Sequence, residues 1–195
     1  MMSSSKASKK FELGTARILN TEDLETSQSK WLGLKTINWV DEEGKERKWE
    51  CTERKKSHSS PDQIDAVAVF TLVSRPNRPL QVILVLQYRP PLGKVVVELP
   101  AGLVDGKEAV EATALRELYE ETGYGKGKDG GMATVEDVNT LMACNPGMTN
   151  ETMALVTVRV KLESDNIPEP QPDEGYAVDA RLMHLACGLS LNVDE

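Results

Sequence analysis

The sequence predicts an α/β or α+β protein in which several strands and one central helix pack as a sandwich. Short apolar, β-branched segments recur along most of the chain, whereas apolar residues repeat at helical spacing in residues 108–122. Strands on both sides of one amphipathic helix in the sequence favour this fold class. The chain has 195 residues, 39% hydrophobic and 28% charged, so we expect one main domain with a buried core.

The N-terminal part is predicted to form a tail followed by an arm. Residues 1–16 begin with a serine- and lysine-rich stretch, which predicts a disordered tail. Residues 17–60 are assigned to the arm, because segments 31–40 and 48–52 have strand-like composition. The loop between them, residues 41–45, contains a glycine, and two strands joined by such a loop predict a β-hairpin.

The main domain is predicted to span residues 61–195. Five apolar segments in it are expected to be strands: residues 66–73, 80–88, 95–99, 139–144 and 151–162. The single helix is expected from about Glu108 to Thr122. Its apolar residues Val110, Ala114 and Leu118 lie four apart, and the glycine at position 123 is a natural stop.

Composition and charge exclude several classes of function. A net charge of −8 argues against a broad nucleic-acid-binding surface. No apolar run approaches the roughly 18 residues that a membrane span needs, so we expect no membrane insertion. Three widely spaced cysteines without a C-x-x-C pair argue against a zinc site or disulfide framework and indicate a reducing compartment. We therefore expect a cytoplasmic protein, with the nucleus and the mitochondrion as alternatives.

Three glutamates are predicted to project from nearly one face of the helix. Glu117 and Glu121 are four residues apart, and Glu120 lies between them. Like charges at this spacing repel each other, so the pattern favours neutralisation by a cation. Carboxylate oxygens suit Mg²⁺, or Mn²⁺, better than zinc. The simpler alternative, a solvated acidic helix face, is favoured if Glu120 and Glu121 are considered alone.

Neighbouring residues extend this pattern. Arg116 can pair with one carboxylate bidentately and hold it in place. Gly102 is expected to let the backbone turn sharply, so that a nearby carbonyl can join the site. Together with Glu108 and Gly123, these residues and the three glutamates make seven fixed positions. At roughly one chance in fifteen for each, a random window matches all seven about once in 10⁸.

The segment from Gly102 to Tyr124 resembles a complete Nudix box. Nudix hydrolases place a loop, a helix and a loop on an α/β/α sandwich and bind Mg²⁺ on a substrate diphosphate, which water then cleaves. The resemblance implies that all the metal ligands are oxygen atoms. They belong to the carboxylates of Glu117, Glu120 and Glu121 and to the carbonyl of Ala101. It further implies that Glu120 can instead accept a proton, and that Arg116 and Glu108 orient the other groups.

Outside this box, roughly residues 17–174 resemble the ADP-sugar pyrophosphatase branch, close to the eukaryotic ADP-ribose enzymes. The matching segments are short: residues 30–31, 47–50, 89–91, 98–102 and 145–149. The resemblance implies hydrolysis of ADP-ribose or another ADP-sugar to AMP and a sugar phosphate by a homodimer. The residues that it implies for substrate binding are Trp31, Trp49, Glu50, Arg54, Arg89, Glu98 and Leu103.

In that branch two tryptophans from the arm, one from each subunit, clamp the adenine, and Trp31 and Trp49 match them. Stacking on an indole contributes about 1–3 kcal/mol per base. Glu50 matches a residue that binds the adenine amino group, and arginines suit the phosphates. Trp39 has no matching role and is expected in the core. For Arg54, a solvated basic run with the two following lysines is the alternative.

The C-terminal part departs from the branch. After residues 170–175, members continue with a glutamate, a last strand and a helix that are missing here, and a closing helix resembles residues 176–186. We interpret the junction as an internal deletion that truncates the domain after about residue 175. The missing glutamate is the one expected to act on the attacking water. Glu174 is the nearest candidate to replace it, and it completes the catalytic set of Arg116, Glu117, Glu120 and Glu121.

Three functions are left open. The first is the ADP-sugar diphosphatase. The second keeps the fold and changes the substrate to an oxidised nucleoside diphosphate, a dinucleoside polyphosphate or NADH. The third is an inactive module that binds ADP-ribose; the intact glutamate face argues against it and the missing segment argues for it.

Overall fold

A computed structural model of the chain describes residues 16–55, 64–163, 168–171 and 178–184. The predicted tail, apart from its last residue, lies outside the described residues. The described parts contain nine strands and one α-helix, α1, Val110–Thr122. The strands are β1 Leu32–Val40, β2 Glu46–Arg54, β3 Ala66–Ser74, β4 Gln81–Arg89, β5 Lys94–Glu98, β6 Ala101–Leu103, β7 Met132–Ala143, β8 Thr152–Lys161 and β9 Val178–His184. A mixed α/β fold with an N-terminal hairpin is thus confirmed.

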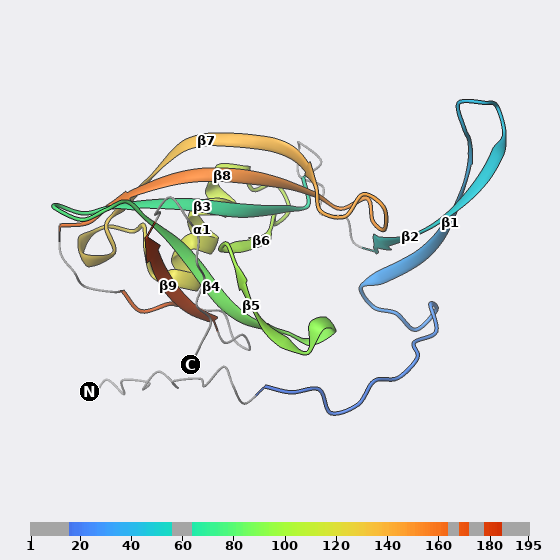
Figure 1. Cartoon of the computed structure of the whole chain (residues 1–195), viewed down its shortest axis with the longest axis horizontal. Coiled ribbons are helices and arrows are strands. Elements are labelled where there is room, and N and C mark those ends of the chain that lie inside the picture. The colour runs from blue at the N-terminus through green and yellow to red at the C-terminus, as the bar shows by residue number, and fades with distance from the viewer. Residues whose placement is uncertain (1–15, 56–63, 164–167, 172–177, 185–195) are drawn as a thin grey trace.

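The central sheet has the strand order β5-β4-β3-β8-β7. β3 runs parallel to β8 along its whole length, but it pairs with β4 at only two positions, Leu72 with Val82 and Val73 with Gln81. Beyond this point β3 and β4 diverge, and the short strands β5 and β6 lie between them (Figure 1). This opening places β6 beside the helix.

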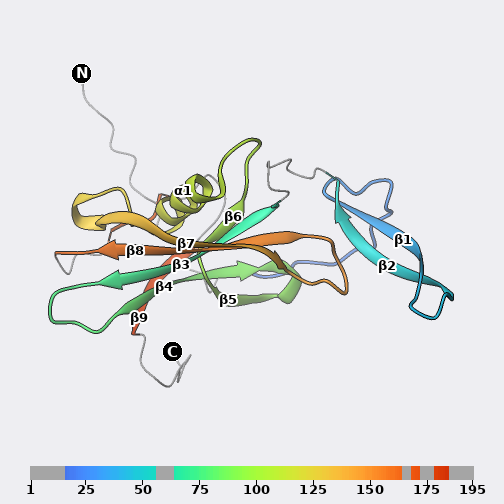
Figure 2. The ribbon, with the colours of Figure 1, turned by 90° about the horizontal axis from the view of Figure 1, so that it is seen from above.

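The helix α1 covers one face of the sheet (Figure 2). Its apolar side chains at helical spacing, Val110, Ala114 and Leu118, are buried against β3 and β8 in the main core. It begins two residues later than predicted and ends at Thr122, because Gly123 adopts the left-handed conformation and its N–H bonds the Tyr119 carbonyl. The described residues contain no second α-helical layer, so only one side of the expected α/β/α sandwich is seen in them.

Two predicted elements differ from the structure, one in its start and one in its type. β7 begins at Met132, seven residues before the predicted start, and a bulge between Val135 and Asp137 breaks the alternation that marks a strand. The segment expected to be a closing helix contains β9 instead, which pairs with the edge of β4 from Gln81 to Gln87. Its Leu182 packs against the core. No helix in the described residues is long and apolar enough to cross a membrane.

The arm is a complete antiparallel hairpin. β1 and β2 pair at nine positions, from Leu32 with Arg54 to Val40 with Glu46. The Asp41 carboxylate closes the turn by accepting N–H bonds from Glu43 and Lys45. The hairpin projects away from the central sheet (Figure 1). Trp39 lies on it and is 38% exposed, so its prediction as a core residue was wrong.

Candidate active site

The helix α1 brings its glutamates against β6. The Glu121 carboxylate accepts the backbone N–H of Ala101 at 3.0 Å. The Glu117 carboxylate lies against Gly102, where a Cβ atom would overlap it. Gly102 itself is an extended residue within β6 and pairs with Val67, so the predicted sharp turn was wrong. A side chain at this position would displace the Glu117 carboxylate, which occupies its space.

Arg116 is the centre of an ion-pair network. Its Nη1 lies 2.7 Å from Glu117 Oε1 and 3.1 Å from Glu120 Oε2, and its Nη2 lies 3.1 Å from Glu108 Oε2. Nη2 also donates to the carbonyl of Leu103 at 3.3 Å. The hydrogen bond from Arg116 is the largest influence on Glu108 and lowers the pKa of its carboxyl group. These contacts fix the guanidinium between the helix and β6.

A second residue holds Glu108 in place. The Thr113 hydroxyl donates to Glu108 Oε2 at 2.9 Å, one helical turn from the start of α1. Sequence analysis missed this residue, because a threonine on the buried face of a helix gives no signal of such a contact. Thr113 is fully buried, so its hydroxyl adds a fixed donor to the network.

Burial sets the electrostatics of the two inner carboxyl groups. It raises the pKa of Glu121 to about 7, and the nearby charge of Glu117 acts in the same direction. The N–H of Ala101 and the charge of Arg89 oppose this shift. Burial also raises the pKa of Glu117, despite the adjacent Arg116. Both groups are therefore costly to ionise unless positive charge is nearby.

Arg89 and Glu98 lie at the same site. Arg89 Nη2 is 2.8 Å from Glu98 Oε2, across the antiparallel pair of β4 and β5. Both charges act on the pKa of Glu121, which places them near the glutamate face. The fold thus brings together residues that lie in four segments of the sequence: Arg89, Glu98, Ala101 to Leu103, and Arg116 to Glu121.

The predicted adenine-binding residues lie elsewhere in a single chain. The Trp49 indole N–H donates to the Gly147 carbonyl at 3.0 Å, in the turn between β7 and β8. Arg54 pairs with Glu151 at 2.8 Å and is half-buried, so it does not belong to a solvated basic run. Trp31 is 62% exposed, with the Lys30 ammonium 4.6 Å above its ring.

The geometry of the hairpin separates these side chains. Trp49 pairs with Ile37 within the hairpin. The carbonyl of Trp31, the residue before β1, accepts the backbone N–H of Lys55, the residue after β2. This offset of six residues corresponds to about 20 Å along a strand, so one hairpin cannot clamp a base between both indoles. Neighbouring strand residues point to opposite faces, so the Glu50 side chain does not share the face of Trp49.

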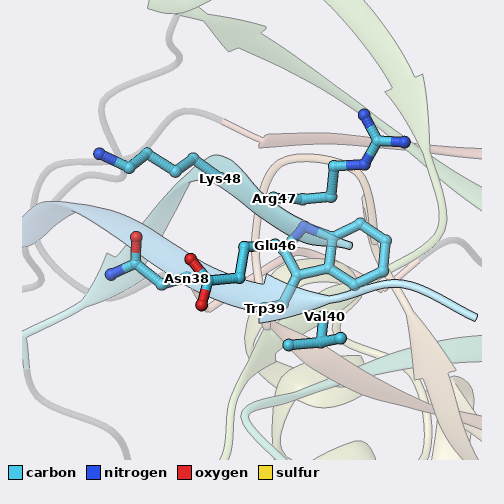
Figure 3. Close-up of a pocket in the computed structure, with 6 residues that line it drawn as sticks. All are labelled: Asn38, Trp39, Val40, Glu46, Arg47 and Lys48. Atoms are coloured by element: carbon cyan, nitrogen blue, oxygen red, sulfur yellow. The ribbon is translucent and has the colours of Figure 1, made fainter. Parts of the chain in front are cut away.

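A hollow at the tip of the arm is separate from the glutamates. It is lined by residues 38–40 and 46–48, among which Trp39 and Arg47 extend from paired positions of the two strands (Figure 3). The hairpin tip lies far along the molecule from α1 (Figure 1). The glutamate face therefore remains the candidate active site.

The segment after β8 also reaches this helix. The backbone N–H of Gln171 donates to the Glu120 carbonyl at 2.8 Å and so caps the last turn of α1. No sequence signal predicted this contact. Glu174, three residues further on, lies outside the described residues.

The chemistry of the donors fits a hard divalent cation. Among the described residues, no three acidic, histidine or cysteine side chains are arranged to hold a metal ion in this conformation, and Arg116 contacts both Glu117 and Glu120. The side chains of Glu117, Glu120 and Glu121 offer carboxylate oxygens, which Mg²⁺ and Mn²⁺ prefer as ligands. Burial raises the pKa of Glu117 and of Glu121, and a bound cation would offset part of the cost of ionising them.

Comparison with known proteins agrees with this geometry. Residues 63–187 match the model of the NUDIX domain. The chain belongs to the Nudix hydrolase family. It is 40% identical to an uncharacterized Nudix hydrolase of Schizosaccharomyces pombe over 166 residues, covering 84% of this chain and 76% of that protein.

Two further Nudix relatives have named activities. An ADP-ribose pyrophosphatase of Saccharomyces cerevisiae is 34% identical, with 85% of this chain and 79% of that protein covered. An ADP-sugar pyrophosphatase of Mus musculus is 36% identical, with 81% and 69% covered. A crystal structure of an ADP compounds hydrolase is similar in fold, with a TM-score of 0.51, 22% identity and coverage of 86% of this chain and 77% of that one.

Proposed function

We propose that this protein is an Mg²⁺-dependent hydrolase that cleaves the pyrophosphate bond of ADP-ribose or another ADP-sugar, giving AMP and a sugar phosphate. The observation that carries the proposal is the pair of partly buried carboxyl groups, Glu117 and Glu121, on one face of α1 against β6. The similarity to yeast and mouse enzymes with these named substrates supports the choice of an ADP-sugar.

The residues that would hold Mg²⁺ are the carboxylates of Glu117, Glu120 and Glu121 and the carbonyl of Ala101; Mn²⁺ suits the same donors. When bound, the cation supplies Lewis-acid polarisation of phosphoryl oxygens and acidification of the attacking water. Arg116 orients Glu117 and Glu120 through its two close contacts. Glu120 and Glu174 are the candidates to accept the proton of the water.

Charged residues beside the glutamates suit the rest of the substrate. Arg89 is 43% exposed, and its planar guanidinium can bind a phosphate oxygen pair. Glu98 fixes Arg89 from β5, and Leu103 contributes its carbonyl to the fixation of Arg116. We propose that Arg54 also faces the substrate, from the base of the arm.

The arm is proposed to bind adenine in a homodimer. Trp31 and Trp49 are both about half exposed or more, but they are too far apart on one hairpin to stack on the same base. One indole from each of two copies removes this constraint. For Glu50 the proposed contact with the adenine amino group rests on the resemblance, since its side chain lies on the hairpin face opposite to Trp49.

The direct test is incubation of the full chain with ADP-ribose and Mg²⁺, with and without a chelator, followed by measurement of AMP. We expect AMP only without the chelator. A panel with oxidised nucleoside diphosphates, dinucleoside polyphosphates and NADH separates the alternatives. If another nucleotide is cleaved and ADP-ribose is not, that nucleotide is the substrate and the proposal for ADP-ribose is wrong. Tight binding of ADP-ribose without AMP would identify an inactive binding module.

A further inference from the structure

The base of the arm is anchored on its own chain. The N–H of Thr52 donates to the Met148 carbonyl at 2.7 Å, and Thr52 forms an isolated parallel bridge with Thr149. Trp49 lies three residues earlier on β2. Its indole N–H donates to the carbonyl of Gly147, which precedes Met148 in the same turn. These contacts bind β2 to the turn between β7 and β8, which joins two strands of the central sheet.

A half-buried ion pair closes this anchor. Arg54 is the last residue of β2, and its Nε lies 2.8 Å from Glu151 Oε1, with side chains 36% and 22% exposed. Glu151 is itself fixed, because its N–H donates to the Thr149 hydroxyl and its carbonyl accepts the N–H of Cys144. The carboxylate therefore belongs to the rigid sheet, whereas the guanidinium belongs to the arm.

We propose that Glu151 is a positioning residue for nucleotide recognition. Through Arg54 it fixes the base of the arm, and it thereby places Trp49 and Arg54 relative to the glutamates of α1. The inference rests on the proposed function, since it assigns Trp49 and Arg54 to the substrate. The other contacts of the anchor involve main-chain carbonyls or a backbone bridge, so this ion pair is its charged, directional element.

The anchor matters because a two-stranded hairpin does not fix its own orientation. Such a hairpin is marginally stable alone, and its position depends on what it contacts. Loss of one partly exposed ion pair shifts a docking equilibrium about fivefold. A displaced arm weakens binding of the adenine, whereas the carboxylates on α1 keep their positions. The expected signature is thus a change in KM with kcat preserved.

The test compares Glu151→Gln with Glu136→Gln, a matched control that removes the Glu136–Arg159 ion pair between β7 and β8, away from the arm. Hydrogen exchange of the peptide around Thr52 reports anchoring without any need for turnover. We expect about fivefold faster exchange and at least a fivefold higher KM for ADP-ribose in E151Q, with kcat within twofold. E136Q should match the wild type in all three.

Equal exchange in E151Q and the wild type would overturn the anchor, and faster exchange with an unchanged KM would overturn its role in recognition. If E151Q does not fold, the double variant Arg54→Glu with Glu151→Arg restores the attraction, and recovered protection of Thr52 is the expected result. Unprotected Thr52 in this folded double variant would contradict the proposal. Failure of the wild type to release AMP would remove the proposed function but leave the exchange result to decide the anchor.

Discussion

At the scale of single residues, the fold places two carboxyl groups where desolvation disfavours their ionised form. Partial burial raises the pKa of Glu121 to about 7, and it raises the pKa of Glu117 as well. A structural role would be better served by neutral side chains of similar size. The cost of ionisation is therefore consistent with a site that binds a cation.

This electrostatic cost predicts how metal-free stability depends on pH. Between about pH 4.5 and pH 7 the unfolded chain releases the Glu121 proton while the folded chain keeps it, so the free energy of unfolding falls as the pH rises. The full shift corresponds to about 3 kcal/mol. Glu121→Gln should lose this part of the slope. Urea denaturation in a chelator at pH 5 and pH 8 measures it; parallel slopes for both proteins would contradict the prediction.

Gly102 offers a second test at this scale. Gly102→Ala places a Cβ on the Glu117 carboxylate, which can move because it is the end of a flexible side chain. We expect a change in the free energy of unfolding within about 1 kcal/mol. The displaced carboxylate should lower kcat about 100-fold. Gly33→Ala is the control, because a Cβ on this strand glycine would make only ordinary van der Waals contacts. Normal turnover by G102A would show that Glu117 need not occupy this position.

At the scale of elements, the sequence predicted what local patterns determine. The helix, its glutamate face and its glycine stop follow from spacing alone. β9 did not, because residues 178–184 fit two periods: Ala180 and Leu182 alternate with Asp179 and Arg181, while Val178 and Leu182 are four apart. The segment forms a strand because it pairs with the edge of β4. The ion pair of Asp179 with Arg181 lies on the face of β9 opposite to Ala180 and Leu182.

The site residues show the same division. The carboxylates share one helix, so their clustering could be predicted from the sequence. The Arg89–Glu98 pair near Glu121 was predicted only by resemblance, and the contacts of Glu151, Thr113 and Gln171 depend on tertiary packing. Gly102 was identified correctly as important but for the wrong reason, because the neighbour that needs its space is 15 positions away in the sequence.

The end of α1 gives a prediction about stability. Gly123 has a φ of 75°, and a Cβ there would overlap the Glu169 carbonyl oxygen. Gly123→Ala should lower the free energy of unfolding by about 2–4 kcal/mol. Alanine is strained at this positive φ, and the backbone at Glu169 must also move away from the new Cβ. Gly106→Ala has a similar positive φ but open space, and it should cost about 1 kcal/mol. Equal losses in urea denaturation would show that the contact with Glu169 is unimportant.

At the scale of the whole molecule, the arm is the least self-sufficient part. Apolar side chains are exposed on both faces of the hairpin, with Leu34 68% and Ile37 47% exposed. Two strands alone do not bury enough surface to be stable, so the arm needs a partner surface beyond its anchored base. We propose a second copy of the chain as this partner, because the proposed adenine site also takes one tryptophan from each of two copies.

Leu34→Glu should therefore convert a dimer into a monomer and raise the KM for ADP-ribose. The substitution should leave the fold of the monomer intact, because this side chain is exposed within one chain. Met132→Glu, at an equally exposed position on β7, is the control and should stay dimeric. Light scattering after size exclusion gives the mass. A monomeric wild type would rule out the shared adenine site.

The central claim is that the partly buried glutamates Glu117 and Glu121 of α1 serve turnover rather than nucleotide binding. The most direct measurement is the rate of AMP release from ADP-ribose by Glu117→Gln and Glu121→Gln, alongside calorimetric binding of ADP-ribose. We predict a loss of at least about 100-fold in kcat with binding retained within a few-fold. Turnover at the wild-type rate in either variant would contradict the account.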